Sequence, residues 1–291
     1  MKKIFFLVFL LFLFNCKKTA EFIPENRDVK NPEISETKTS IKINPDKNSI
    51  KERLYPPEDY IWVEEKAGSF GEYLEKHKLK NYNSPILKYD GTEIATQNLH
   101  EAIFDIDIGS KDLQQCADAF IRLRAEYLFK SKNFDEIKFH FTSGDLMTWN
   151  DYKNGVRAVV NGNNVSFRKT QNLDDSYENF RKYLDLIFTY AGTISLNKET
   201  KPVLKTSDLK SGDILITAGS PGHIVFIAGV AENKEGKRLF LLAEGFTPAQ
   251  SIHLLKNPIN KNISPWYELD VNSPATFTAR YIFKPSNFRR F

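Results

Sequence analysis

The chain has 291 residues, of which 41% are hydrophobic and 27% are charged. This composition supplies a core for one large domain or two small ones, and it excludes a fully disordered or collagen-like chain. The 41 basic and 37 acidic residues leave a net charge of only +4, and no basic stripe with interleaved aromatics accompanies it. Nucleic-acid binding is therefore not expected. Two cysteines are too few for a disulfide-stapled scaffold or a cysteine-rich metal site.

The first fifteen residues have the organisation of a signal peptide. Met1-Lys2-Lys3 is a short basic start, and Ile4–Phe14 is an apolar run that is too short for a stable membrane-spanning helix. The following Asn15-Cys16 completes a segment that resembles the lipobox of bacterial lipoproteins, although Asn15 stands where a small residue is usual. The resemblance implies cleavage before Cys16 and acylation of that cysteine. A plain secretory signal is the alternative.

Acylation of Cys16 sets the expected location of the protein. Several acyl chains attach a protein stably to a bilayer, because each buried CH₂ adds about 0.8 kcal/mol. We expect a cell-envelope protein that is anchored to a bacterial membrane through the lipid on Cys16 and is exposed to the periplasm or the exterior. Residues 16–52 are rich in Lys, Glu, Asn, Ser, Thr and Pro without a persistent period, which is typical of a disordered tether.

Residues 53–291 are expected to form one domain. The predicted elements, in chain order, are a strand at 60–63, a capped helix from 69, a hairpin around Asp90-Gly91, a strand at 103–108, a long helix over 113–127, a strand at 137–141, a hairpin over 157–167, a helix at 174–190, and strands at 213–216, 223–230, 239–243 and 276–283. Helices come mainly early and strands late, which predicts an α+β fold with an antiparallel sheet.

Cys116 is the first candidate for chemistry, because it lies near the start of the long helix. The unpaired N–H groups and the helix dipole at this end stabilise a thiolate, and we expect them to lower the thiol pKa. The same N–H groups can hold an oxyanion, and Gln115 directly before the cysteine can add a donor. The alternative is a core cysteine, since Cys116 also lies on the apolar stripe of the helix.

His223 and Glu244 follow in an order that suits nucleophilic catalysis. His223 comes directly after a turn with Gly219 and Gly222 and opens an apolar strand, where an imidazole can face a helix end across a groove. Glu244 ends the probable hairpin partner of that strand, so its carboxylate can accept from the second imidazole nitrogen and fix the tautomer. A histidine bonded to its turn and a solvated glutamate are the structural alternatives.

These patches, Gln115-Cys116 at a helix start, Gly222-His223 before an apolar strand and a polar residue after the next strand, resemble the CHAP and NlpC-type cysteine amidases and peptidases. The resemblance implies a papain-like fold, with the antiparallel sheet packed against an N-terminal nucleophile helix. It also implies that Cys116 is the nucleophile, His223 the base and Glu244 the orienting residue. The stretch between Cys116 and His223 is longer than usual in those families, which indicates an enlarged insertion that holds the 157–167 hairpin and the 174–190 helix.

A closer resemblance covers the whole folded region. Gln114–Ala119, Arg122–Tyr127 and Pro248-Ala249-Gln250 resemble a family of bacterial lipoprotein-like proteins of unknown function, which implies kinship of fold without supplying an activity. Three further residues are weaker candidates for substrate binding: Gln250, Trp149 and Trp266. Gln250 is also an alternative to Glu244 as the orienting residue. Neither a metal nor an organic cofactor is expected, since no carboxylate or cysteine stands at metal-ligand spacing from the candidate histidines.

The leading hypothesis is a membrane-anchored thiol amidohydrolase or peptidase that cleaves peptide amides of the cell wall, with peptidoglycan as the substrate within reach. An acyltransferase with the same residues would differ only in its acceptor. The alternative from a different class is a non-catalytic lipoprotein that uses the same fold to bind a glycan, a peptide or a protein.

Overall fold

A computed structural model describes residues 42–291 of the chain. The expected signal peptide (1–15), the lipidated Cys16 and the tether up to residue 41 lie outside the described residues. The helices of the described part include none that is long and apolar enough to cross a membrane. Residues 42–52 belong to the fold, and their prediction as tether is wrong. Ile43 forms a β-bridge with Leu54, Ile50 is fully buried, and the Leu79 N–H donates to the Asn48 carbonyl, so this segment is joined to the rest of the fold.

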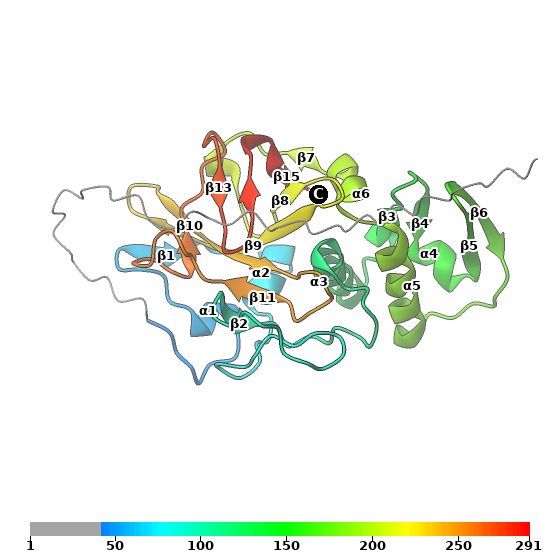
Figure 1. Cartoon of the computed structure of the whole chain (residues 1–291), viewed down its shortest axis with the longest axis horizontal. Coiled ribbons are helices and arrows are strands. Elements are labelled where there is room, and N and C mark those ends of the chain that lie inside the picture. Colours follow the sequence, from blue (N-terminus) through cyan, green and yellow to red (C-terminus); the bar gives the residue numbers. More distant parts are fainter. Residues whose placement is uncertain (1–41) are drawn as a thin grey trace, which may run out of the picture. The chain divides into compact units, whose positions relative to one another are not determined.

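The described part contains six α-helices and fifteen strands (Figure 1). The helices are α1 (Ile50–Arg53), α2 (Phe70–Glu75), α3 (Cys116–Lys130), α4 (Trp149–Lys153), α5 (Tyr177–Tyr190) and α6 (Thr193–Glu199). The strands are β1 (Tyr60–Trp62), β2 (His100–Ile103), β3 (Lys138–His140), β4 (Leu146–Thr148), β5 (Val156–Asn161), β6 (Asn164–Lys169), β7 (Lys201–Pro202), β8 (Ile214–Thr217), β9 (His223–Asn233), β10 (Arg238–Glu244), β11 (His253–Leu255), β12 (Trp266–Tyr267), β13 (Thr276–Phe277), β14 (Ile282–Phe283) and β15 (Phe288–Arg290).

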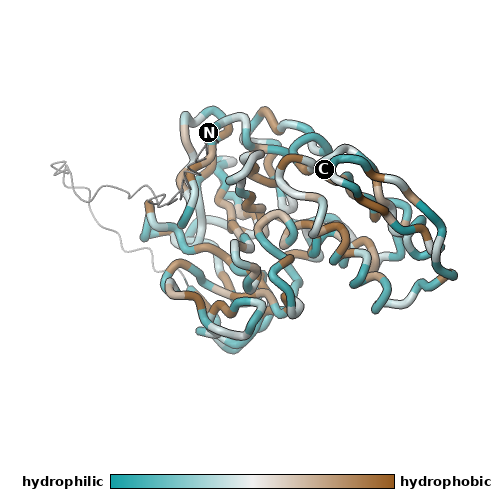
Figure 2. Tube along the Cα trace, turned by 45° about the vertical axis from the view of Figure 1, so that its right-hand side comes forward, coloured by the Kyte–Doolittle hydropathy of each residue, from teal (hydrophilic) through white to brown (hydrophobic). Residues whose placement is uncertain are grey.

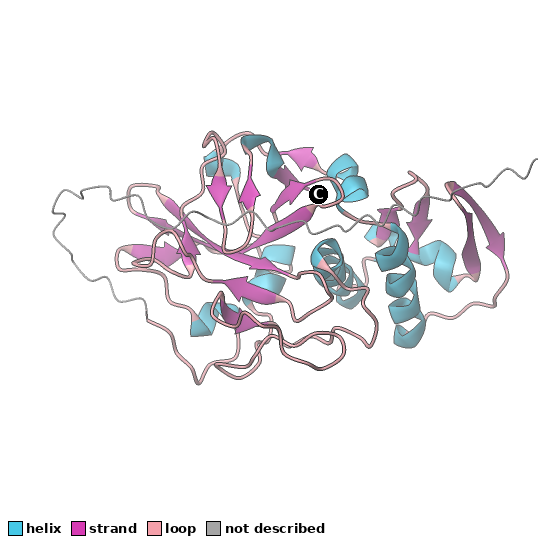
Figure 3. Cartoon of the chain, viewed as in Figure 1, coloured by secondary structure: helices cyan, strands magenta, loops and turns pink. Residues whose placement is uncertain are grey.

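A nine-stranded sheet organises this part of the chain. Its order is β2-β11-β10-β9-β8-β15-β7, with β1 added beside β9 and β12 beside β10, and the paired strands are antiparallel. The hairpins β3–β4 and β5–β6 form separate two-stranded sheets beside α4 and α5 (Figure 3). The fold is therefore a mixed α+β fold with a large antiparallel sheet and few helices, which confirms the predicted class at this level.

Several predicted elements need correction. The strand expected at 103–108 lies earlier, at β2, because residues from Asp105 leave the sheet. The long helix expected over 113–127 begins later, at Cys116 with Gln115 as its N-cap, and runs to Lys130. The strand expected over 276–283 is the hairpin β13–β14, which closes through a bond from the Thr278 N–H to the Tyr281 carbonyl. Its turn, Ala279-Arg280, carries none of the Asn-Gly or Gly signals by which short hairpins are recognised.

The central strand β9 supports a core on each face of the sheet. Side chains alternate between the two faces of a strand. Ile224, Phe226 and Ala228 therefore pack with α3 in the larger core, while Val225 and Ile227 pack in a second core with the β13–β14 hairpin. The run is apolar throughout because the strand is covered on both sides. Hydrophobic segments lie mainly in the interior of the trace, and hydrophilic ones mainly at its periphery (Figure 2).

Helix α3 is fixed to the sheet by aromatic contacts. Phe120 is fully buried, and its ring lies 5.7 Å from that of Phe226 on β9 and 6.0 Å from that of Phe70 on α2, measured between centroids. Aromatic pairs in such tilted and edge-to-face arrangements add about 0.5–1.5 kcal/mol beyond the burial of their area. These contacts set the position of the α3 start relative to the ends of the central strands.

We expect Phe120→Ala to lower the free energy of unfolding by about 3–5 kcal/mol, because it leaves a cavity between α3 and β9. Urea denaturation followed by circular dichroism measures this. Ile61→Ala is the matched control, since Ile61 is 74% exposed and its truncation should change the value by less than about 0.5 kcal/mol. Equal effects of the two substitutions would contradict the described packing of α3.

Candidate active site

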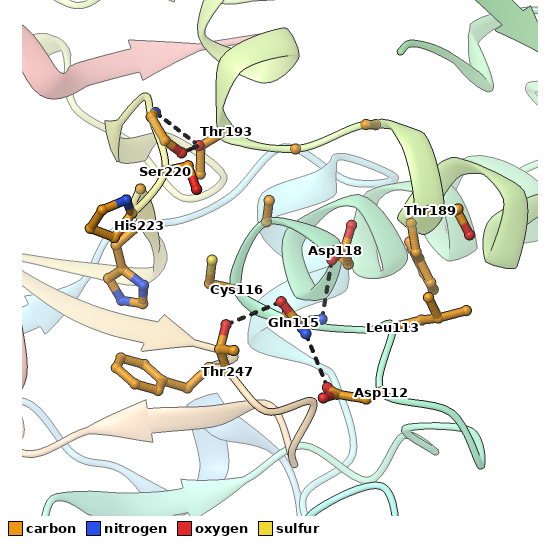
Figure 4. A pocket seen from close by; sticks show the side chains of 18 of the residues that line it. Asp112, Leu113, Gln115, Cys116, Asp118, Thr189, Thr193, Ser220, His223 and Thr247 are labelled. Carbon is orange, nitrogen blue, oxygen red and sulfur yellow. Dashed lines mark hydrogen bonds between the residues drawn. The ribbon is translucent and has the colours of Figure 1, made fainter. Parts of the chain in front are cut away.

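A pocket of about 620 Å³ opens where the start of α3 meets the ends of the central strands (Figure 4). Cys116 and Gln115 line it on the side of α3, and His223 faces them. Its lining is completed by residues from several segments: Asp112, Leu113, Ala117, Asp118, Phe188, Thr189, Ala191–Thr193, Gly219–Gly222, Phe246, Thr247 and Tyr281. The structure thus brings three of the four predicted catalytic residues to one cavity, with Glu244 directly behind His223.

The Cys116 thiol is the first side chain of α3 and is free of any disulfide. The pKa of this thiol is raised to about 11, chiefly by burial and next by the neighbouring Asp118 carboxyl, while the backbone N–H groups of Ala117 and Cys116 oppose the change. The expected lowering of the thiol pKa is therefore wrong in its net direction. The helix start acts as predicted, but removal of the sulfur from water has the larger effect.

The residues around the helix start are held by polar contacts. The Gln115 N–H donates to the Asp118 carboxylate at 3.1 Å, which caps the first turn of α3. The Gln115 side chain donates from Nε2 to Asp112 and accepts at Oε1 from the Thr247 hydroxyl. One side-chain N–H of Gln115 is thus already engaged, and one remains for a bound group. Burial raises the pKa of Asp118 well above its ordinary value, and its Oδ1 has no hydrogen-bond partner.

His223 and Glu244 form a buried hydrogen bond. His223 Nε2 lies 2.8 Å from Glu244 Oε2, and the two side chains are 3% and 0% exposed. A carboxylate accepts hydrogen bonds only, so the Nε2 atom carries the proton and donates it. The lone pair of the neutral imidazole then lies on Nδ1. The ring is held on other sides by Phe246 and Tyr281, whose ring centroids lie 5.1 and 5.0 Å away.

Two further side chains reach the same carboxylate. Arg280 Nε donates to Glu244 Oε1 at 2.8 Å, and Arg280 Nη2 donates to Nε2 of His253 at 2.6 Å. His253 Nδ1 in turn donates to the Ser251 carbonyl, and its strand position pairs directly with Glu244. Burial alone would raise the pKa of Glu244, but the side chains of His223 and His253 beside the carboxylate outweigh it, and the pKa lies well below its ordinary value. Glu244 is therefore an anion at neutral pH.

Two glycines allow the segments of the pocket to approach each other. A Cβ atom on Gly245 would lie 2.6 Å from the Ala119 Cβ and 3.0 Å from the Gln115 carbonyl, so the chain after β10 touches the start of α3. A Cβ atom on Gly222 would lie 2.4 Å from the Thr193 hydroxyl and 2.7 Å from the Gly219 carbonyl. These close approaches position Glu244 and His223 beside the helix that carries Cys116.

Cys116 and His223 reach the pocket from different sides of the sheet. His223 alternates with Val225 and Ile227, whose side chains belong to the second core, whereas α3 packs on the larger core. The two side chains meet beyond the ends of the strands (Figure 4). Among the described residues, no hydrogen bond joins the Cys116 sulfur to a His223 nitrogen. Catalytic hydrogen bonds are often loose before substrate binds, so this geometry is compatible with proton transfer.

The three weaker candidates, Gln250, Trp149 and Trp266, do not line the pocket, and their role in substrate binding stays a prediction. Trp149 and Trp266 are core residues, 1% and 0% exposed, and the Trp266 indole donates to the Tyr55 carbonyl. Large aromatic side chains favour such burial. Gln250 is 1% exposed and forms a bridge with Lys88, and the position that orients His223 is filled by Glu244.

Sequence reasoning missed Arg280 and Tyr281. Both lie at the turn of the β13–β14 hairpin, and the unrecognised turn hid the fact that they leave the strand and reach back to β9 and β10. His253 also contacts the Glu244 cluster, through Arg280 and beside the carboxylate. Within residues 42–291, no group of three or more His, Cys, Asp or Glu side chains is arranged to hold a metal ion.

Comparison with known families assigns the folded part. A family model described as "Domain of unknown function (4846)" matches residues 50–290. The chain belongs to this family. Searches of curated proteins and of solved structures found no match. The region matched by the family model contains the whole pocket and the cluster around Glu244, so both are features of the family domain as this chain carries it.

We expect Glu244→Gln to lower the free energy of unfolding by about 3–5 kcal/mol at neutral pH, because it leaves Arg280 without its buried partner. A carboxyl whose pKa is lower in the folded state stabilises the fold above its unfolded pKa, and this stabilisation is lost as pH falls through the folded pKa. The difference from the wild type should therefore shrink below about pH 4.5. Urea denaturation at neutral and acidic pH measures it.

Glu235→Gln provides the control, because Glu235 forms an exposed pair with Lys237 in which both side chains are 72% exposed. Exposed pairs contribute about 0–1 kcal/mol. A destabilisation by Glu244→Gln that is the same at acidic and neutral pH would contradict the description of Glu244 as a buried anion.

Proposed function

We propose that the protein is a membrane-anchored thiol amidohydrolase or peptidase that acts on peptide amides of the cell wall. The observation that carries the proposal is the arrangement of Cys116 and His223 on opposite walls of one pocket, with the far nitrogen of His223 bonded to the buried Glu244. A nucleophile, a base and a group that orients the base are the minimum for covalent catalysis of amide hydrolysis.

The bond changes follow from the protonation states in the pocket. Because the thiol is neutral, His223 Nδ1 must take the proton from Cys116 as the sulfur attacks the amide carbonyl and forms the C–S bond. The imidazolium then gives this proton to the leaving nitrogen as the C–N bond breaks. Water, deprotonated by the same histidine, releases the acid from the thioester and restores the thiol.

Charge that develops on the carbonyl oxygen requires donors near the sulfur. The first N–H groups of α3, at Cys116 and Ala117, lie next to the thiol, and the free N–H of the Gln115 side chain faces the same pocket. Each well-placed donor of this kind contributes about 3 kcal/mol to stabilisation of a tetrahedral intermediate. Gln115 is held in place for this role by Asp112 and Thr247.

The substrate class rests on the resemblance to CHAP and NlpC-type enzymes and on the expected lipid anchor. Those enzymes cleave peptidoglycan peptides and related amides, and a lipid on Cys16 would keep the domain beside the cell wall. We propose a papain-like arrangement of the fold on the same basis, with α3 as the nucleophile helix and the 134–190 region as an insertion.

A second function, a non-catalytic binding module, is favoured by one observation. The Cys116 thiol is neutral and is not hydrogen-bonded to His223. In this version, the pocket holds a cell-wall glycan or peptide, or a partner protein, without covalent chemistry. The two functions differ in whether bound material is cleaved and in whether His223 affects the reactivity of the sulfur.

One prediction of the proposed function concerns the effect of His223 on the reactivity of the Cys116 thiol. In the full chain near pH 7, His223→Ala should slow alkylation of Cys116 by iodoacetamide by about 10²–10⁴-fold, because the base that accepts the thiol proton is removed. Mass spectrometry of the peptide that contains residue 116 gives the rate. His140→Ala is the control, since that side chain is 43% exposed and pairs with Glu199. Equal rates in all three proteins would favour the binding module.

Another prediction of the proposed function concerns the substrate. The purified full chain incubated with peptidoglycan should release new amino groups, and Cys116→Ala should abolish the release while it preserves binding in a sedimentation assay. Abolition with retained binding follows if only the nucleophile is lost. Sedimentation with peptidoglycan without release by the wild type would identify a binding module, and equal release by Cys116→Ala would exclude Cys116 as the nucleophile.

A further inference from the structure

Arg280 brings a fixed positive charge to the cluster of side chains around Glu244. Its guanidinium bonds both Glu244 and His253, and it also lies over the Phe246 ring at 4.3 Å from the centroid. The Arg280 side chain is 15% exposed, so the pair with the fully buried Glu244 is largely removed from water. An arginine in such a place has a role in charge balance as well as in geometry.

We propose that Arg280 is the counter-ion that balances the charge of Glu244 and thereby leaves His223 neutral and available as the base. This inference rests on the proposed function of Cys116 and His223. A buried anion is strongly disfavoured without a partner, and a neighbouring group that can bind a proton will do so to neutralise it. With Arg280 present, the Glu244–Arg280 pair has no net charge, and the imidazole need not take a second proton.

The other groups around the cluster do not supply this charge. The following titratable or charged groups face it: His223 on β9 with Tyr281 of the β13–β14 turn against its ring, His253 on β11 with His100 of β2 behind it, Tyr267 on β12, and Cys116 on α3. Burial raises the pKa of Tyr267 above its ordinary value and that of Cys116 to about 11, so both are neutral at neutral pH. The His253 Nε2 atom accepts from Arg280 and therefore does not present a proton to Glu244.

Arg280→Gln removes the charge and keeps a polar side chain. In this variant, Glu244 should be neutralised by a proton on itself or on His223, so the cluster carries one proton more at neutral pH. The rate of Cys116 alkylation falls at acidic pH, where the base is protonated, and we call this part of the pH profile the acidic limb. The limb should then move to higher pH by about 1–3 units. Below the limb, each unit of this shift corresponds to about a tenfold loss of rate, because the basic form changes about tenfold per pH unit. Well above the limb, the rate should return to within about threefold of the wild type.

The experiment measures iodoacetamide labelling of residue 116 in the full chain across pH, for the wild type, Arg280→Gln, Arg280→Lys and His223→Ala. Arg280→Lys retains the charge and should keep the limb near its wild-type position. Arg290→Gln is the matched control: Arg290 pairs with the buried Asp213 at the opposite end of β8 from His223, and its loss should leave the limb unchanged.

The outcomes distinguish a failure of the counter-ion role of Arg280 from a failure of the proposed function of Cys116 and His223. A limb that moves with Arg280→Gln, but not with Arg280→Lys or Arg290→Gln, supports the counter-ion role. A rate that falls equally at every pH indicates only structural damage and overturns it, as does an unchanged limb in Arg280→Gln when His223→Ala is slow. Labelling that does not depend on His223 at all contradicts the proposed function instead.

A stability measurement tests the same inference if Arg280→Gln folds poorly. The double variant Arg280→Gln with Glu244→Gln removes both charges, so it should melt at a higher temperature than Arg280→Gln alone. A double variant that melts at the same temperature as Arg280→Gln, or lower, would overturn the counter-ion role.

Discussion

Glu244 is a fully buried carboxylate on which side chains from three other segments converge. His223 comes from β9, His253 from β11 and Arg280 from the turn of the β13–β14 hairpin. A carboxylate of this burial is disfavoured by several kcal/mol unless its oxygen atoms are bonded and its charge is matched. The fold therefore has to bring these segments together, and the ends of the central strands are organised by this requirement as much as by their apolar faces.

The same cluster fixes the chemical state of the candidate base. Because Glu244 accepts from Nε2, the imidazole of His223 has one defined tautomer, and its remaining lone pair lies on Nδ1. Phe246 and Tyr281 limit rotation of the ring. The thiol on the opposite wall is kept neutral by burial, so the pocket holds an oriented imidazole and a neutral thiol. Under the proposed function, the two would react only when a bound group brings them together or excludes the remaining water.

The sequence predicted those parts that depend on local patterns. The β9–β10 and β5–β6 hairpins have strong turn residues between apolar runs, and the start of α2 has its capping serine, so their existence followed from neighbouring residues. The α+β class with an antiparallel sheet is confirmed for the same reason. The order Cys116, His223, Glu244 also indicated which side chains to compare in space.

Long-range effects account for what the sequence could not indicate. Arg280 contacts Glu244 across 36 residues of chain, and nothing near either residue signals the contact. The pKa of Cys116 depends on how much of the sulfur is buried, which the helix position alone does not determine. Trp149 and Trp266 illustrate the same limit, because an aromatic residue in a sequence fits a groove and a core equally well, and packing decides between them.

Gly245 gives the site a property that none of its reactive groups encodes. The chain after β10 and the first turn of α3 touch there because no side chain intervenes. The distance between the Cys116 sulfur and the His223 ring, across which a proton would pass, thus depends on the missing side chain of Gly245, which itself forms no bond in the site. A single methyl group at that position would act as a spacer, moving the two walls apart while every reactive side chain stayed intact, so the loss of reactivity would come from distance alone.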